Sequence, residues 1–528
     1  MSFDLVIAGG VLADGLGAAL QPADVGITAG RIAAVGPALA GSARRVLRAE
    51  GCLVCPGFID MHSHADLDLL CGRGAETRLL QGITTEVVGN CGFSFYPVAP
   101  ERSQAAYDFL AMLFDDARPE HLCADLDEYI RRVGRPSTNV VSLVGHNLLR
   151  LYANGCERRL GAGVQAAMEA LLARQLDAGA AGLSTGLLYA PACFADRDEL
   201  TALARVVRSR RRLLCCHIRD EGDGLAASIE EVLAVQAASG VALQVSHLKA
   251  SGRRNWGRVP GVLARLEAAV AAGADVRYDA YPFTFGCSTI ITLLPTAMLD
   301  VPTERLMARL REPSERAAVA AALARPECLL ASVGAERIVI AGSVSEAMRR
   351  WVGRTLAEVA AAMGCSVVEA LIEIVLADRG RTSIFLLQMD EDDVRRTATH
   401  PLGLLGSDGI PVQHGVAHPR LRSAFLQMLC RYVRQEGLLD LPSAVERLTA
   451  HPAARLGLAE RGGLRPGCHA DVVVADLEKL DPAADPFRAS SWRGVDAVVL
   501  NGTVVVEHGA LNGERAGVFV KYPRGGQP

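Results

Sequence analysis

Residues 56–64 read PGFIDMHSH, and this run is the strongest indication of the fold. Its first half is apolar and suits the end of a buried strand, and His62 and His64 follow at once. Because successive side chains of an extended chain point to opposite sides, these two imidazoles share one side. Two imidazoles aimed together at a strand end suit a transition metal. A polar pair held by hydrogen bonds in a loop is the alternative, and the motif alone does not separate the two.

Apolar runs of strand length recur along the middle of the chain. Including the first, they cover 52–61, 83–91, 138–146, 180–186, 212–218, 241–247, 274–281 and 402–407. Most are separated by stretches rich in Ala, Leu and Arg with helical periodicity, such as 164–178, 226–239 and 259–272. Eight such repeats predict an α/β fold, a (β/α)8 barrel of the TIM type with its active site at the carboxyl ends of the strands.

The interval between the seventh and eighth strands, about 120 residues, is too long for one helix. We expect an inserted, mostly helical segment at about 285–350, placed to cover the mouth of the barrel.

Both ends of the chain show short apolar runs joined by turns. Strand-like runs lie at 5–7, 25–27 and 32–35, and again at 471–474, 497–500, 504–506 and 518–520. Asn501-Gly502 is a strong hairpin signal between two of them. We therefore predict a small β-sandwich domain formed from residues 1–55 and 460–528, with the metal-dependent barrel over residues 56–459.

Composition narrows the possible partners and location. The net charge is −4 over 528 residues, so there is no basic field to attract nucleic acid or an anionic membrane. The first seven residues contain an acidic residue and only a short apolar run, unlike a signal peptide or a membrane span. We expect a soluble cytoplasmic protein without nucleic-acid or membrane partners. The sequence leaves the oligomeric state open.

The fourteen cysteines are scattered along the chain, unlike the dense framework of a small secreted domain. Cys52 and Cys55 form a CxxC pattern, but they lie inside an apolar strand and no second CxxC accompanies them. We interpret this pair, and the pair Cys215-Cys216, as thiols of the core.

Four more chemically capable residues fall at predicted strand ends: Cys91, His217, His247 and Asp408. Taken singly, each has an ordinary structural interpretation, such as a buried thiol or a helix cap. Together with the first histidine pair they predict one metal site. Zinc binds imidazole and thiolate, keeps one position for water in catalytic sites and lowers the pKa of that water. A nearby aspartate can then move the proton.

Several motifs match a known family. The run PGFIDMHSH, the strand-end histidines and GSDG at 406–409 resemble the amidohydrolase superfamily. Within it, the chain resembles the N-acyl-D-amino-acid deacylases (D-aminoacylases) in GNCG at 89–92, VGHN at 144–147, GLSTGLLY at 182–189, HIRDE at 217–221, SHLK at 246–249, YDAYP at 278–282 and HPR at 418–420. The resemblance covers nearly the whole chain in the same order. Each motif alone is weak, but the set is specific.

Lysine usage supports this placement. The chain has only Lys249, Lys479 and Lys521. Many binuclear amidohydrolases bridge two metals with a carbamylated lysine on the fourth strand, which this chain does not have. The deacylases that it resembles use a cysteine from the second strand, and Cys91 lies at the matching place.

The resemblance implies a role for each candidate residue. It implies that Cys91, His217 and His247 hold one tight Zn²⁺, that His62 and His64 define a second, weaker site, and that Asp408 is the general base and then the acid. The substrate carboxylate is expected to meet Lys249, Arg420, Tyr189, Tyr281 and Ser288. His146 and Arg219 are expected directly behind these residues.

The implied reaction is hydrolysis of an N-acyl-D-amino acid to a carboxylate and a free D-amino acid. Residues 284–295 contain no Arg or Lys to pair with an acidic side chain, which favours a neutral or hydrophobic one. The alternatives are a cyclic-amide hydrolase of the dihydroorotase or hydantoinase type, a D-dipeptide hydrolase, and a non-catalytic barrel serving as a binding module. The absent lysine and Cys91 count against the first, and the intact ligand set counts against the last.

Overall fold

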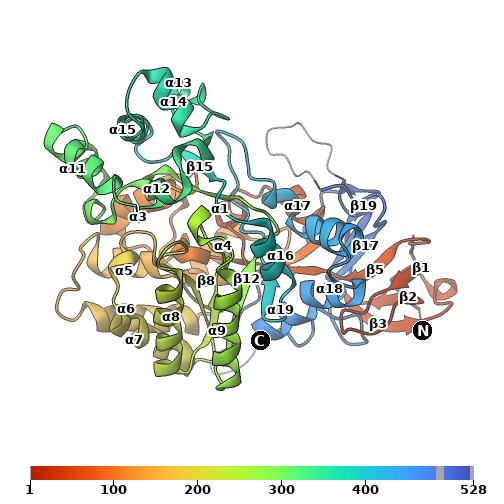
Figure 1. The fold of residues 1–528 in the computed structure, drawn as a ribbon. Coiled ribbons are helices and arrows are strands. Elements are labelled where there is room, and N and C mark those ends of the chain that lie inside the picture. The colour runs from red at the N-terminus through yellow and green to blue at the C-terminus, as the bar shows by residue number, and fades with distance from the viewer. Residues whose placement is uncertain (1, 327, 483–492, 524–528) are drawn as a thin grey trace.

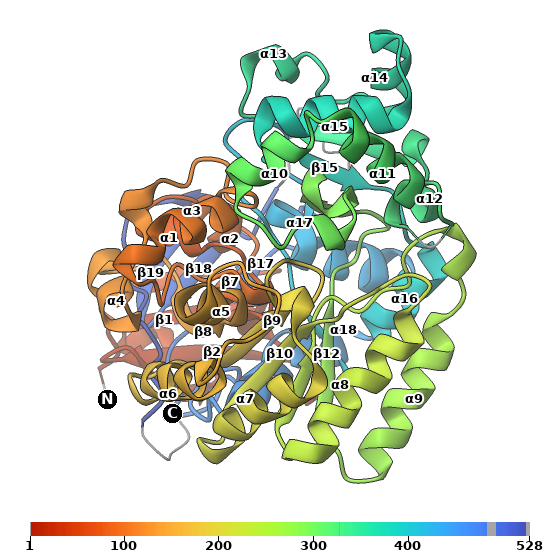
Figure 2. The same cartoon turned by 90° about the vertical axis from the view of Figure 1, so that its left-hand side faces the viewer.

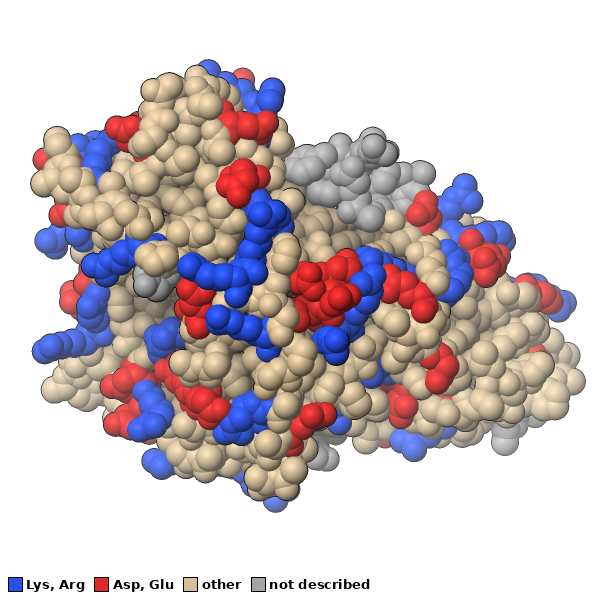
Figure 3. Space-filling view, in the orientation of Figure 1, with Lys and Arg blue, Asp and Glu red and all other residues tan. Residues whose placement is uncertain are grey.

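The computed structural model describes residues 2–326, 328–482 and 493–523 (Figure 1). It has three parts, which are a parallel barrel, a mixed sheet from both chain ends, and an inserted segment above the barrel. On the face shown in Figure 3, acidic and basic side chains are interspersed, as expected for a net charge of −4.

The barrel confirms the predicted fold. Its eight parallel strands are β6 (Phe58–Asp60), β7 (Ile83–Val88), β8 (Asn139–Gly145), β9 (Gly182–Gly186), β10 (Leu213–His217), β11 (Ala242–Val245), β12 (Val276–Ala280) and β16 (Gly403–Leu405), in that spatial order. The strands are almost entirely buried because helices cover their outer side. Figure 2 shows four of these helices in a row, namely α6 (Val164–Asp177), α7 (Arg197–Ser209), α8 (Leu225–Ser239) and α9 (Val259–Ala271).

The first and last strands close the barrel. Met61 N donates to Leu405 O at 3.2 Å, and Asp408 N donates to His62 O at 2.7 Å. Asp60 Oδ1 accepts from Ser407 N at 2.8 Å, and its Oδ2 accepts from Ser407 Oγ at 2.5 Å. Each of the two strands is only three residues long, so these side-chain bonds supplement a short backbone ladder.

The two chain ends form one mixed sheet of nine strands, which confirms that both termini build a common β-structure. Its members are β1 (Leu5–Leu12), β2 (Gln21–Thr28), β3 (Arg31–Gly36), β4 (Val46–Arg48), β5 (Leu53–Pro56), β17 (Val472–Ala475), β18 (Ala497–Leu500), β19 (Thr503–Glu507) and β20 (Ala510–Leu511). The ends meet where β5 pairs antiparallel with β17. Asn501 and Gly502 both have positive φ, as the predicted tight hairpin between β18 and β19 requires.

Two strands predicted near the chain ends differ from the observed structure. The predicted strand 52–61 is two strands, because the chain leaves the mixed sheet after β5 and enters the barrel at β6, with Gly57 between them. Residues 518–520 do not join the mixed sheet. They lie beside the barrel instead, where Val140 N donates to Val518 O and Val520 N to Val140 O, each at 2.9 Å.

The inserted segment lies between β12 and β16. It has a three-stranded antiparallel sheet, β13 (Gly286–Thr289), β15 (Ser383–Leu386) and β14 (Ile338–Gly342), with its own apolar core. Its helices are α10 (Thr303–Arg309), α11 (Pro313–Leu323), α12 (Leu329–Val333), α13 (Glu346–Arg349), α14 (Leu356–Met363) and α15 (Val367–Asp378). The segment thus extends beyond residue 350, since α14, α15 and β15 pack with the preceding elements. It sits above the barrel in Figure 2.

Among the described residues, no single helix is long and apolar enough to cross a membrane. The helices α14 and α15 meet the length and hydropathy criteria only when joined, and they are bent by 94° relative to each other.

We predict that Gly57→Ala destabilises the protein by about 1–3 kcal/mol, the usual cost of overpacking a core. A Cβ at position 57 would overlap the side chain of Thr84, which is buried under the junction of the two sheets. The measurement is the urea midpoint of unfolding.

Gly261→Ala is the matched control. Gly261 lies exposed in α9, and a Cβ there meets no atom of the described residues within 4 Å, so the change should stabilise by up to about 1 kcal/mol. Equal midpoints for the two variants would contradict the prediction.

Candidate active site

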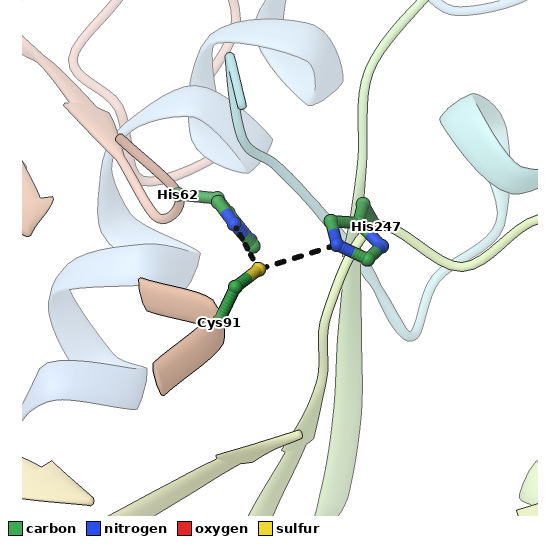
Figure 4. A group of neighbouring side chains, drawn as sticks. All are labelled: His62, Cys91 and His247. Atoms are coloured by element: carbon green, nitrogen blue, oxygen red, sulfur yellow. Dashed lines mark hydrogen bonds between the residues drawn. The ribbon is translucent and has the colours of Figure 1, made fainter. Parts of the chain in front are cut away.

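Six predicted site residues meet at the carboxyl ends of the barrel strands. His62 and His64 follow β6, Cys91 follows β7, His217 ends β10, His247 follows β11 and Asp408 follows β16. All six are buried. Figure 4 shows His62, Cys91 and His247 pointing toward one another from three separate elements.

The donor atoms form three overlapping groups. Cys91 Sγ lies 3.3 Å from His62 Nε2 and 3.4 Å from His247 Nε2. Asp408 Oδ1 lies 3.2 Å from His64 Nε2 and 3.6 Å from His62 Nε2. His217, Glu221 and His247 form the third group, with one ligand atom from each within 4.8 Å of the others. Since His62 and His247 each belong to two groups, the donors make one continuous cluster.

The donor set fits zinc. Sulfur and imidazole nitrogen are the atoms that zinc binds most readily in proteins. His217 is fully buried, yet neither of its ring nitrogens has a hydrogen-bond partner within the described part of the chain. Buried polar atoms are rarely left without partners, and a metal ion at this place would supply the missing one.

Three of the clustered residues have unusual backbone conformations. Cys91, His247 and Asp408 have φ of 53°, 33° and 48°, in the left-handed region that residues other than glycine rarely adopt. Each such residue costs about 1–2 kcal/mol and persists only where its surroundings impose it. Strain of this kind concentrates at functional sites, and here it directs three side chains into the cluster.

Opposite charges set the ionisation of the cluster. Burial alone would raise the pKa of Asp408, but the Arg420 guanidinium, 2.8 Å from Asp408 Oδ2, and the hydrogen bond from His64 hold this pKa well below its usual range. Burial likewise opposes ionisation of Cys91, yet the neighbouring His62 and His247 lower the pKa of the thiol well below its ordinary value. Both groups are therefore available in their charged forms.

Glu221 is a member of the cluster that the motifs did not single out. Its Oε1 lies 2.9 Å from His247 Nδ1 and 2.5 Å from Lys249 Nζ. Burial would raise the pKa of this carboxyl, but Lys249 and His247 lower it far below its usual value. Its position four residues after His217, within HIRDE, was the available signal.

A second carboxylate, Asp279, also lies beside the cluster. Asp279 Oδ1 is 2.9 Å from His62 Nδ1 and accepts from His247 N at 2.8 Å. An acidic residue at a buried position of barrel strand β12 was the signal in the sequence.

A cavity of about 950 Å³ opens onto the cluster. All five predicted substrate-binding residues line it, namely Lys249, Arg420, Tyr189, Tyr281 and Ser288. The Arg420 guanidinium lies 4.5 Å over the Tyr281 ring, and its Nε and Nη2 have no hydrogen-bond partner among the described residues. The Ser288 hydroxyl, also buried, has none in the same set.

The structure places His146 and Arg219 differently from the rest. His146 does not line the cavity, since Nδ1 bonds Thr185 Oγ1 at 3.0 Å and Nε2 bonds Glu199 Oε1 at 2.8 Å. Arg219 borders the cavity, but its guanidinium donates to both oxygens of Glu231 and to the carbonyls of Cys193 and Ala195. His146 and Arg219 therefore bond to residues around the cavity and do not contact the donor atoms of the cysteine–histidine cluster.

Comparison with known proteins places the chain in one family over most of its length. The model of the family described as "Amidohydrolase family" matches residues 45–506. An N-acyl-D-glutamate deacylase of Alcaligenes xylosoxydans xylosoxydans is 40% identical, and the match covers 95% of this chain and 93% of that protein. A D-aminoacylase of the same organism is 33% identical, and the match covers 98% of this chain and 97% of that protein. The crystal structure of a Bordetella bronchiseptica N-acyl-D-glutamate deacylase, complexed with zinc and a phosphonate inhibitor, is 36% identical with a TM-score of 0.83, covering 99% of this chain and 100% of that one. These matches confirm the resemblance inferred from the motifs.

We predict that Cys91→Ala weakens zinc binding by more than about 100-fold, because losing a direct ligand costs more than losing a partner behind it. Zinc affinity is measured by competition with a chromogenic chelator.

Cys215→Ala is the control, since that thiol is equally buried but belongs to none of the donor groups. It should leave zinc affinity unchanged. Equal affinities for Cys91→Ala and wild type would exclude Cys91 as a ligand.

Proposed function

This chain belongs to the amidohydrolase family, among its N-acyl-D-amino-acid deacylases, and we propose that it hydrolyses N-acyl-D-amino acids to a carboxylate and a free D-amino acid. One observation carries the proposal. The ionised Asp408 contacts the buried cysteine–histidine cluster through Oδ1 and Arg420 Nη1 through Oδ2, and Asp408 and Arg420 line the same cavity. A group that moves protons is thus placed between a metal site and a site for a carboxylate.

We assign the ligands as follows. Cys91, His217 and His247 hold one tightly bound zinc, while His62 and His64 define the second, weaker site. When bound, zinc lowers the pKa of a coordinated water and polarises a carbonyl group. The thiolate favours zinc over the hard cations Mg²⁺ and Ca²⁺, which prefer oxygen ligands.

Asp408 moves the proton. Its Oδ2 is held by Arg420, so Oδ1, which faces His64, is the oxygen that accepts a proton from the attacking water. The low pKa of this carboxyl keeps it ionised, which leaves it able to accept a proton. The same proton then passes from Oδ1 to the amide nitrogen as the C–N bond breaks, and the D-amino acid leaves as an amine.

Arg420 and Lys249 hold the substrate's α-carboxylate, with Tyr189, Tyr281 and Ser288 around it. Arginine matches a carboxylate through two parallel N–H donors, and Arg420 has two nitrogens without partners in the described structure. Lys249 adds a point charge and lies 5.8 Å from the centre of the same Tyr281 ring. Fixing the carboxylate and the scissile amide leaves one side of the α-carbon for the side chain, so the site can distinguish enantiomers. We propose the D enantiomer because the relatives are named for D substrates.

We propose a neutral or hydrophobic substrate side chain. Of the described residues lining the cavity, four are Lys or Arg. Lys249 and Arg420 are already assigned to the α-carboxylate, and Arg219 is paired with Glu231. The fourth, Arg325, is exposed at the cavity edge.

Much of the remaining wall is apolar. It includes Leu113, Leu187, Leu293, Leu294, Leu323 and Leu329. An acidic side chain in contact with this wall would lose hydration without a dedicated counter-ion, which is costly. The 40% identity to an N-acyl-D-glutamate deacylase favours an acidic side chain instead. Arg325 is the residue that would pair with such a side chain, and it is therefore the one to test.

We predict that the zinc-loaded protein releases amine from N-acetyl-D-amino acids and not from the L enantiomers, and that Asp408→Asn lowers kcat by about 1,000-fold, within the range for loss of a general acid–base. The assay pairs N-acetyl-D- and L-Met, Leu, Phe and Glu.

Asp393→Asn is the control, because Asp393 is a buried carboxylate outside the main cavity that caps Gly257 N at 2.7 Å. It should keep full activity. Preference for L substrates, or release from hydantoins alone, would refute the deacylase proposal, and the latter would favour a cyclic-amide hydrolase.

For the side chain, we expect kcat/KM for N-acetyl-D-Met, -Leu or -Phe to exceed that for N-acetyl-D-Glu by about 10-fold or more. Arg325→Gln should leave the neutral substrates unchanged. If the glutamate derivative proves best and Arg325→Gln removes that preference, the neutral side chain is wrong and Arg325 is the counter-ion.

A further inference from the structure

Asp279 is a buried carboxylate of β12 that contacts two clustered histidines at once. It does not line the cavity, so it cannot touch the substrate. Its Oδ1 lies 2.9 Å from His62 Nδ1 and 2.8 Å from His247 N. Its Oδ2 accepts from Gln244 Nε2 at 3.1 Å, which fixes the orientation of the carboxylate. Asp279 is neither one of the proposed zinc ligands nor one of the residues assigned to the reaction.

The contact with His62 selects a tautomer. An ionised carboxylate can only accept a hydrogen bond, so a neutral His62 must carry its proton on Nδ1. The lone pair is then on Nε2, which faces Cys91 Sγ at 3.3 Å. A carboxylate behind a histidine fixes the ring and raises the basicity of the nitrogen that binds metal.

The contact with His247 holds the backbone. The regular pairing of β11 with β12 ends at Val245 and Tyr278. Beyond it, Asp279 accepts from two successive amides, from Leu248 N with its carbonyl at 2.8 Å and from His247 N with its carboxylate at 2.8 Å. His247 lies there at φ 33°, and its Nε2 is directed to Cys91 Sγ at 3.4 Å. The carboxylate thus stabilises a strained conformation that aims the ring.

We propose that Asp279 is the positioning residue of the metal centre, since one oxygen sets the tautomer of His62 and the backbone of His247. These two histidines share one donor group with Cys91 and are assigned to different zinc sites, so Asp279 aligns the two sites with one another. The inference rests on the proposed zinc sites, but it assigns a role to a residue outside them. Loss of the carboxylate should therefore weaken zinc binding without changing the recognition of substrate.

The test compares Asp279→Leu and Asp279→Asn with wild type in the full-length protein. The zinc affinity is measured by chelator competition. The Co²⁺ form is examined by its thiolate charge-transfer and ligand-field spectrum. kcat and KM are measured at saturating zinc. Asp279→Leu should bind zinc about 10–100-fold more weakly, as measured for partners behind metal ligands in other proteins. Its Co²⁺ spectrum should change, and kcat should fall with KM constant within about twofold.

Asp279→Asn keeps an oxygen acceptor but loses the charge. It should fall between wild type and Asp279→Leu, with zinc binding weakened by about 3–10-fold. If Asp279→Leu does not fold, this variant decides the question. A zinc affinity within twofold of wild type in folded Asp279→Asn, with an unchanged Co²⁺ spectrum, would overturn the proposal.

Asp378→Leu and Asp378→Asn are the matched controls. Asp378 is equally buried in the inserted segment and accepts from Ser345 N at 2.9 Å and Thr382 Oγ1 at 2.5 Å, far along the chain from the ligands. These variants should lose stability but keep zinc affinity and spectrum. An equal loss of zinc affinity in both pairs would assign the effect to general destabilisation and refute the positioning role.

The result stays separable from the proposed reaction. Zinc affinity and the Co²⁺ spectrum report on Asp279 whether or not the protein releases amine from N-acyl-D-amino acids. Conversely, a wild-type protein that binds zinc without deacylase activity would refute the proposed reaction and leave the positioning role measurable.

Discussion

The hydrogen bonds that close the barrel between β6 and β16 are the constraint on which the site depends. They place residues 347 positions apart in direct contact, with Asp60 accepting from Ser407 and His62 O accepting from Asp408 N. Because the histidines follow the first strand and the aspartate follows the last, closure is what brings the proton carrier to the metal ligands. An open sheet of the same strands would hold the two at opposite edges. The closing strands are short, and the buried Asp60 side chain supplies part of the bonding that a longer ladder would otherwise provide.

Buried charge at this site is arranged in compensating pairs. Asp408 meets Arg420, Glu221 meets Lys249, and Asp279 faces His62. In each pair, the attraction between the partners offsets the free energy lost when both are removed from water. An unpaired buried charge would cost several kcal/mol. Beside these pairs, the two ring nitrogens of His217 and two nitrogens of Arg420 have no hydrogen-bond partner among the described residues. Those atoms mark where a metal ion and an anionic substrate group would complete the network.

The inserted segment supplies much of the apolar wall of the cavity. Leu293, Leu294, Leu323 and Leu329 come from it and form an apolar wall over strand ends that are polar at their base. It also contacts the loop after Asp408, where Ser343 N donates to His414 O and Val416 N donates to Ala341 O. The donor cluster and this apolar wall thus come from different parts of the chain.

The sequence by itself determined the eight strands, the two-ended β-domain and the residues that gather at the strand ends. These features are local, because an apolar run marks a strand and the residue after it marks the strand's end, and the shortage of lysine excluded one kind of bridge without any structure. Tertiary structure alone decided the rest. The full extent of the inserted segment, the partners of His146 and Arg219, and the contacts of Glu221 and Asp279 depend on which strands become neighbours. His62 and Asp279 are 217 residues apart, and no local pattern encodes that contact, since it arises only when the barrel closes and packs their strands around one centre.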